Sequence, residues 1–426
     1  MSIIDLGEVR DEPAVVPPRR RPRAAGRPLR SSAVLLLALV VLAAATPPPQ
    51  RTVSVVPAAR GATAYLAADG VFVVDPPTPN EDRFLTAYAQ PSPGAGADLR
   101  RRWQVSLVRY GDYLDVQVER GLVLAMGVSA ANGVFQTTAY DAETGQQRWR
   151  QPGAPQPIAD GGLLLADLPG DGAGAMSRVE PDNGRVLWSV PVPPPGYPGY
   201  HVAGGQVDRF VLVQPTGEVQ VHDAGTGRLL RSVDTLSGDR SAFQRVHVVD
   251  DLLLLVPPGS TRLVSYGLAG LEPRWTAEVP LVSFVVGCGD LICVLQQTGG
   301  LQVLDPATGV VRWSDPGEEL LADVRHDRLL MAGAGQRYAV RDAATGRSRA
   351  ELGEWDLVPV LGRDDPVIGV RSGDDGRLVV GELDLVAGRS RIIDVLPDVA
   401  GSCQASLPIL LCRRLDGSTA LWRLPR

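Results

Sequence analysis

The stretch 139-AYDAETGQQRW-149 recurs along the chain and decides the fold. Close copies are 221-VHDAGTGRLLR-231, 303-VLDPATGVVRW-313 and 340-VRDAATGRSRA-350, and weaker copies are 179-VEPDNGRVLW-188 and 265-SYGLAGLEPRW-275. The glycines that end these turns, with a weak seventh copy, lie 37 to 43 residues apart: Gly145, Gly184, Gly227, Gly270, Gly309, Gly346 and Gly388. A period near 40 residues is typical of propeller blades.

One unit can be followed in full between residues 199 and 233. Its four short apolar or alternating runs are separated by turns rich in glycine and aspartate; they span residues 200–203, 209–214, 218–222 and 228–233. Four strands in about 40 residues make one blade of a propeller. Since no segment after residue 50 shows sustained helical periodicity, the pattern predicts an all-β propeller of four-stranded blades.

The letters of the repeat have a structural explanation. An aspartate carboxylate accepts hydrogen bonds from the N–H groups of its own turn, a threonine hydroxyl does the same, and glycine takes the positive φ that closes the hairpin. A tryptophan four residues later lies on the outer strand, where it can pack against the next blade. We assign this role to Asp141, Thr144, Gly145, Trp149, Gly184, Trp188, Asp223, Thr226, Gly227, Trp275, Asp305, Thr308, Gly309, Trp313, Asp342, Thr345 and Gly346.

The repeat resembles the tryptophan-docking pattern A-x-D-x-x-T-G-x-x-x-W of the PQQ-like propeller family. Residues 139–149 match it fully, residues 303–313 have valine in place of alanine, and the copies at residues 221–231 and 340–350 lack the tryptophan. The resemblance covers roughly residues 50–426. The family includes quinoprotein dehydrogenases and non-enzymatic, BamB-like members, and the second branch fits this chain better.

The blade number follows from counting units. Eight complete units begin near residues 60, 111, 155, 199, 243, 283, 320 and 356, and a three-strand piece follows at residues 402–424. The stretch 52-TVSVV-56 can supply the missing outer strand of that piece. A literal count gives nine blades, whereas the resembling family usually has eight. We expect eight, with seven to nine open, in one propeller over residues 60–426, preceded by a linker and ring-closing strand at residues 47–59.

The N-terminus carries targeting signals. Residues 1–30 are rich in proline and arginine, have a net charge of +3 and are expected to be a disordered tail. The uncharged apolar run 31–46 follows, and the rest of the chain has a net charge of −9. This asymmetry predicts a single-pass transmembrane helix with the tail in the cytoplasm and the propeller outside. A cleaved signal peptide, ending at the alanines 43–45, or a buried core helix remain alternatives.

The four cysteines agree with export. Cys288 and Cys293 flank one short turn and Cys403 and Cys412 flank another, so local disulfides are favoured over the other pairings. Two pairs of buried free thiols remain an alternative. The CxxxxC spacing and the lack of a nearby histidine argue against zinc.

No sequence motif indicates catalytic activity or cofactor binding. The chain has no adjacent cysteine pair, no C-x-x-C-H haem site, no G-x-S-x-G elbow and no P-loop. We therefore expect no enzyme, no catalytic residue, no metal and no cofactor, and the acidic propeller disfavours nucleic acid. The predicted function is a protein-interaction scaffold in the cell envelope, with unidentified envelope proteins as partners. A ligand-binding or sensing propeller and a quinoprotein-type oxidoreductase are the alternatives.

Overall fold

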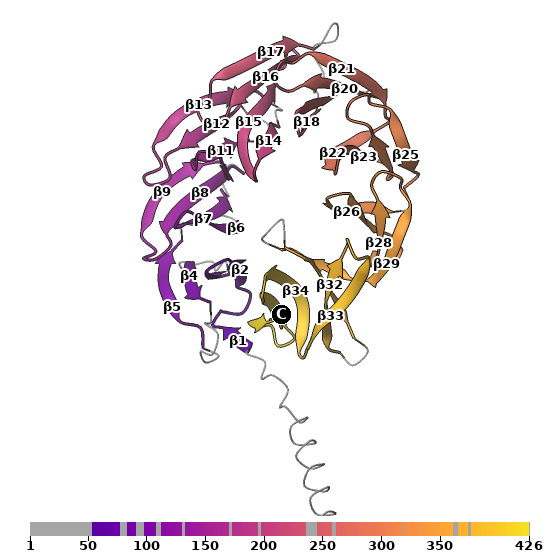
Figure 1. The fold of residues 1–426 in the computed structure, drawn as a ribbon. Coiled ribbons are helices and arrows are strands. Elements are labelled where there is room, and N and C mark those ends of the chain that lie inside the picture. Colours follow the sequence, from indigo (N-terminus) through magenta and orange to yellow (C-terminus); the bar gives the residue numbers. More distant parts are fainter. Residues whose placement is uncertain are drawn as a thin grey trace, which may run out of the picture. The chain divides into compact units, whose positions relative to one another are not determined.

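The computed structural model describes residues 53–76, 83–90, 98–107, 112–129, 133–169, 173–194, 197–235, 245–257, 261–317, 319–360, 365–373 and 376–425. The chain divides into two compact units, residues 1–51 and 52–426, and the described residues all belong to the second. This second unit contains nine four-stranded antiparallel sheets, which follow one another around a ring (Figure 1). We number them blades 1 to 9 in chain order.

The first strand of each blade is the innermost and the fourth is the outermost, as Figure 1 shows for most blades. Blades 1 to 3 comprise β2 (Thr63–Ala67), β3 (Gly70–Val74), β4 (Phe84–Ala89), β5 (Arg101–Ser106), β6 (Asp112–Glu119), β7 (Leu122–Val128), β8 (Phe135–Asp141), β9 (Gln147–Pro152), β10 (Ala154–Pro157), β11 (Leu163–Asp167), β12 (Gly174–Val179) and β13 (Val186–Val192). Blades 4 to 6 comprise β14 (Gly199–Ala203), β15 (Gln206–Val213), β16 (Glu218–Asp223), β17 (Leu229–Asp234), β18 (Arg245–Val249), β19 (Leu252–Val256), β20 (Arg262–Gly267), β21 (Pro273–Glu278), β22 (Val282–Cys288), β23 (Leu291–Gln296), β24 (Leu301–Leu304) and β25 (Val311–Asp315).

Blades 7 and 8 have the same order, with one short 3-10 helix between the second and third strands of blade 7. They comprise β26 (Leu320–Arg325), β27 (Arg328–Ala332), η1 (Ala334–Gln336), β28 (Arg337–Asp342), β29 (Ser348–Glu354), β30 (Asp356–Val358), β31 (Val367–Ser372), β32 (Leu378–Asp384) and β33 (Arg389–Leu396). Blade 9 joins both ends of the described chain, because its order is β34-β35-β36-β1. Its strands are β34 (Val399–Ser406), β35 (Ile409–Arg414), β36 (Thr419–Arg423) and β1 (Val53–Val56).

The expectation of eight blades was wrong, because the structure contains nine. The ninth is split between the chain ends, with Val53 opposite Trp422 and Val56 opposite Thr419. Blade 9 also meets blade 1: the Gln404 side chain accepts a hydrogen bond from the Leu66 N–H at 2.9 Å and donates one to the Ala64 carbonyl at 3.1 Å. The ring is therefore closed by a shared sheet and by side-chain hydrogen bonds, which removes a free sheet edge at the junction.

The core lies between neighbouring sheets. The second and third strands of the blades carry most of the buried residues, as in β3, where every residue is buried, whereas the outer strand β13 is mostly exposed. Phe72 and Leu85 of blade 1 belong to the same apolar cluster as Val123 and Tyr140 of blade 2. A strand that is covered on both faces has a continuous run of apolar residues, which explains segments such as β19 (LLLLV).

The two ends of each blade differ in their connections. The turn between the first and second strands and the turn between the third and fourth strands lie at the same end, where backbone hydrogen bonds join them. Examples are the Ala142 N–H with the Gly121 carbonyl at 2.8 Å and the Ala343 N–H with the Asp327 carbonyl at 2.9 Å. We call this side of the ring the turn face. Since β1 runs antiparallel to β36, its first residue, Val53, also lies at the turn face.

The predicted transmembrane run at residues 31–46 lies outside the described residues. Within the residues that the structure does describe, no helix has the length and apolar character needed to cross a membrane.

Candidate functional site

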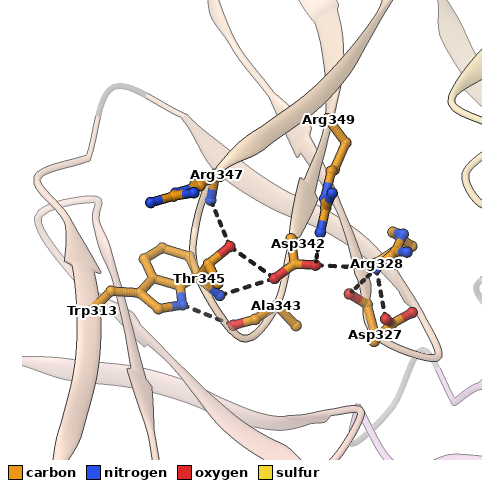
Figure 2. Close-up of polar contacts among 8 residues, drawn as sticks. All are labelled: Trp313, Asp327, Arg328, Asp342, Ala343, Thr345, Arg347 and Arg349. Carbon is orange, nitrogen blue, oxygen red and sulfur yellow. Dashed lines mark hydrogen bonds and ion pairs between the residues drawn. The ribbon is translucent and has the colours of Figure 1, made fainter.

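The repeated turn joins each blade to the one before it. In blade 7, one oxygen of the Asp342 carboxylate accepts hydrogen bonds from the Thr345 N–H at 3.0 Å and the Thr345 hydroxyl at 2.8 Å (Figure 2). The other oxygen is 2.7 Å from a guanidinium nitrogen of Arg349. Hydrogen bonds from Arg349 and Thr345 keep the pKa of Asp342 below its usual range. The carboxylate is thus held charged at the centre of the turn.

Tryptophan provides the contact between blades. Figure 2 shows the Trp313 indole of blade 6 against the turn of blade 7, where its Nε1–H donates to the Ala343 carbonyl at 2.8 Å. A Cβ added at Gly346 would lie 2.7 Å from Cδ2 of that indole. The same hydrogen bond forms at four other junctions, from Trp103 to Ala142, Trp149 to Pro181, Trp188 to Gly225 and Trp275 to Pro306. Glycine is needed here for two reasons, its positive φ and the indole that packs on it.

The other residues of the repeat occupy the same positions with small differences. Asp141, Asp223 and Asp305 each accept hydrogen bonds from their own Thr144, Thr226 and Thr308, and Gly145, Gly184, Gly227 and Gly309 all have positive φ. Blade 5 departs from the prediction. Gly270 is not the residue with positive φ there; Leu271 is, at 55°, and its N–H donates to the Gly267 carbonyl at 2.8 Å, as the Gly145 N–H does to the Asp141 carbonyl.

The disulfides are local. Cys288 is bonded to Cys293 across the β22–β23 turn, and Cys403 to Cys412 across β34 and β35. The buried-thiol alternative is therefore wrong, since all four sulfurs are paired. Both disulfides are almost fully buried.

Five of the nine junctions carry the tryptophan of the repeat, and the junctions after blades 4 and 7 are among those that lack it. Arg231 occupies its position in blade 4 and Ala350 occupies it in blade 7. At the second of these junctions the turn of blade 8 approaches closely, since a Cβ added at Gly388 would lie 2.9 Å from that of Ala350. No indole N–H is present at position 350 to donate to the turn of blade 8.

A cleft of about 1010 Å³ opens on the turn face beside this junction. Its walls come from the inner strands and turns of blades 5 to 7 and from the turn of blade 8. The lining residues include the apolar Phe284, Val286, Leu321, Leu385 and Val386, and the charged Asp250, Asp323, Arg325, Asp365, Glu382 and Asp384. Residue Leu385 belongs to the same turn as Gly388, so the cleft borders the junction where the repeat has alanine.

Some of the charged side chains in the cleft form ion pairs, and others do not. Arg325 is 2.9 Å from Asp323, and Arg391, which lies outside the cleft, is 2.6 Å from Glu382. Asp384 instead accepts hydrogen bonds from the backbone N–H groups of Val386 and Ala387. Within the described parts of the chain, Asp250, Asp365 and Asp384 form no ion pair. The cleft is therefore electronegative.

The histidines are spread over the ring. His201 contacts Asp208, His222 stacks on Phe210 with ring centroids 5.0 Å apart, and His326 lines the cleft. His247 meets Phe284 edge-on at 5.4 Å, and burial, with a smaller effect of Arg245, lowers its pKa to about 4. The residues that the structure describes contain no group of three or more histidine, cysteine or acidic side chains that could hold a metal ion.

A second, smaller cavity of about 590 Å³ lies on the opposite face, between blades 7 and 8. There the Arg371 guanidinium lies 4.6 Å from the centre of the Trp355 ring. Sequence reasoning found neither cavity. Apart from the turn of blade 8, the lining of the larger cavity lies outside the repeated turns, so no copy of the repeat marks it.

Comparisons with known proteins found a family model and several solved structures that are similar to this chain. The family model described as outer membrane protein assembly factor BamB matches residues 96–314 and 215–353. No curated protein matches the chain. Among solved structures, BamB from Moraxella catarrhalis is 12% identical, with 87% of this chain and 97% of that chain covered and a TM-score of 0.44. Sqt1 from Saccharomyces cerevisiae is 12% identical, with 78% and 96% covered and a TM-score of 0.48.

A quinohemoprotein alcohol dehydrogenase from Comamonas testosteroni is 15% identical, with 68% of this chain and 65% of that chain covered and a TM-score of 0.38. The family model, in contrast, spans more than half of the chain and includes six of the copies of the turn described above. The chain belongs to the PQQ-like propeller family whose model carries the BamB description.

Proposed function

We propose that this protein is a membrane-tethered, extracytoplasmic propeller that acts as a protein-interaction scaffold in the cell envelope. The observation that carries the proposal is the turn-face cleft, because it combines apolar side chains in contact with water and carboxylates that form no ion pair within the described residues. Phe284 is 54% exposed and Val386 is 71% exposed. Exposed apolar groups surrounded by polar ones mark protein-interaction surfaces.

The family supports the same reading. Its model is described as an assembly factor of the outer membrane, and such a role consists of holding other proteins. The closed ring suits it, since blades that are joined by indole contacts present a preorganised surface, which lowers the entropic cost of binding.

The tether and the location are inferred from the sequence. The basic tail and the apolar run at residues 31–46 have the charge order of a single-pass anchor with its N-terminus in the cytoplasm. Disulfides form and persist in oxidising compartments, so the two disulfides support an extracytoplasmic location. Val53, the first described residue, lies at the turn face, which also carries the cleft.

Crosslinking in the living cell tests the scaffold role. The full-length tagged chain is crosslinked, purified under denaturing conditions and compared with a chain that ends at residue 51. We expect one or a few envelope proteins that co-purify with the full chain alone. A full-length control with Asp290→Asn, an exposed acid of the turn face outside the cleft lining, should retain them.

The absence of any partner above background would contradict the scaffold role. In that case, titration of the purified chain with PQQ and calcium separates the alternatives, because tight stoichiometric binding would favour an oxidoreductase. Location is tested separately: protease added to intact spheroplasts should remove the propeller and leave residues 1–30 protected, and protection of both parts would contradict the predicted topology.

A further inference from the structure

The turn-face cleft has an apolar wall that lies open to water. Phe284 of β22 contributes its ring, and Val286 and Leu321 extend the wall along β22 and β26. Val386, in the turn of blade 8, contributes a second apolar side chain, which is the most exposed of the large apolar residues described. An apolar side chain of a partner that covered these groups would gain about 25 cal/mol for each Å² of apolar surface removed from water.

The charge of the cleft selects the partner. The carboxylates of Asp250, Asp365 and Asp384 form no ion pair within the described residues, and Arg325 is engaged by Asp323. A segment that carries arginine or lysine would find complementary charge, whereas an acidic segment would be repelled. The propeller as a whole adds to this field, because residues 51–426 have a net charge of −9 with Arg51 among them.

The size and the opening of the cleft suit a peptide segment. Its volume of about 1010 Å³ lies at the upper end of the range for small-molecule sites, and it opens to the surface between turns of several blades. An extended peptide segment fits such an opening, with its side chains distributed between the apolar wall and the carboxylates.

We propose that the turn-face cleft binds an extended, positively charged segment of a partner protein, which places an apolar side chain against the wall of Phe284 and Leu321. This inference rests on the proposed scaffold function and adds the site and the chemistry of the partner. Basic residues set orientation and speed of association, and the apolar side chain supplies most of the affinity.

Two exposed valines of the turn face allow a matched test. A photo-crosslinking amino acid replaces Val386 inside the cleft in one full-length chain and Val310, 60% exposed in the turn of blade 6, in another. After irradiation in the cell, the adducts are digested and the crosslinked partner peptide is sequenced. We expect about tenfold more adduct from position 386 than from position 310, and a partner peptide with more arginine and lysine than aspartate and glutamate.

Charge and apolar variants then report on the two halves of the proposal. Asp250→Asn and Asp365→Asn should each reduce the adduct at position 386 about fivefold, while Asp290→Asn leaves it unchanged. Phe284→Ala should reduce it about tenfold or more, while Leu114→Ala, on the inner strand β6 and 47% exposed, leaves it unchanged. Retained binding in all of these variants would overturn the inference.

The remaining outcomes are distinguishable. Equal adducts from positions 310 and 386, or an acidic partner peptide, would overturn the cleft as the site while the scaffold role stands. Adducts to residues 17–30 of the chain itself, or to a second propeller, would replace the partner protein by a copy of this chain and overturn the inference as well. The absence of adducts at every position, together with no partner from whole-chain crosslinking, would remove the scaffold role too.

Discussion

The Trp313 indole of blade 6 packs on Gly346 of blade 7, and a Cβ at that glycine would lie 2.7 Å from the ring. The indole also donates to the Ala343 carbonyl in the same turn. One side chain thus fixes both the distance and the register between two neighbouring sheets. The repeat conserves this relationship along the ring because no blade can bury its apolar faces alone.

Gly346→Ala should therefore destabilise the propeller for two reasons. The left-handed conformation, with φ of 68°, costs an alanine about 1–2 kcal/mol, and the displaced indole adds about 1–3 kcal/mol. Thermal unfolding of the purified full-length chain measures the loss. Gly121→Ala is the control, since its φ is 76° and nothing lies within 4 Å of the added Cβ. An equal loss in both variants would show that backbone strain alone matters.

The sequence predicted the architecture because the signal was repeated. Each copy of the turn contains residue types that favour the same hairpin. A period near 40 residues leaves few alternatives to four-stranded blades. The expected number was one too low because it followed the usual eight blades of the resembling family and not the literal count of nine. Blade 8 has neither the threonine nor the preceding tryptophan of the repeat, and blade 9 takes β1 from the other end of the chain.

The cleft could not be predicted in the same way. Its lining spans residues from Asp250 to Val386, four blades that only the closed ring brings together. Apart from Asp384, which opens the turn of blade 8, its charged residues lie outside the repeated turns. Exposure of Phe284 also depends on the neighbouring inner strands, which periodicity does not describe.

The stability of the propeller should depend on His247 in mildly acidic solution. Burial keeps the folded-state pKa near 4, below the 6.5 of an unperturbed histidine, so the unfolded chain binds a proton more readily between these values. The part of the free energy of unfolding that depends on a neutral His247 is fully present above pH 6.5. It is lost as the pH falls toward 4, and it amounts to on the order of 3 kcal/mol in all. Thermal midpoints measured from pH 7 to 4 should decline.

His247→Gln should flatten this decline. Burial also lowers the pKa of His222, opposed by its hydrogen bond to the Gly227 carbonyl, so part of the slope should persist in the single variant. Carboxylates such as Asp342 act at lower pH, because their pKa is held below 3.8. An unchanged slope between pH 6.5 and 4 in the variant would show that His247 is not the group responsible.

Loss of the Cys288–Cys293 disulfide should weaken both the fold and the cleft. The bond closes a short loop, so its removal costs about 2 kcal/mol, and Gly287 and Gly289 beside it line the cleft. The double variant Cys288→Ala/Cys293→Ala should unfold at a lower temperature. It should also lose adducts at position 386. The matching double variant at Cys403 and Cys412 in blade 9 should lower the midpoint but retain the adducts, and loss of adducts in both would indicate a general effect of unfolding.

Closure of the ring depends on one short strand, and its two faces provide a direct test. In β1, Val56 is buried at 2% exposure, whereas its neighbour Val55 is 47% exposed. Val56→Asp places a carboxylate in the core and should cost about 3 kcal/mol or more, because it separates β1 from β36 and leaves a free strand edge. Free edges pair with other chains, so gel filtration should show oligomers in addition to a lower unfolding temperature.

The control is Val55→Asp, which adds the same charge to the same strand but on the side that faces solvent. It should change neither measurement by much. Equal effects of the two variants would mean that charge in β1, and not loss of the closing strand, destabilises the protein.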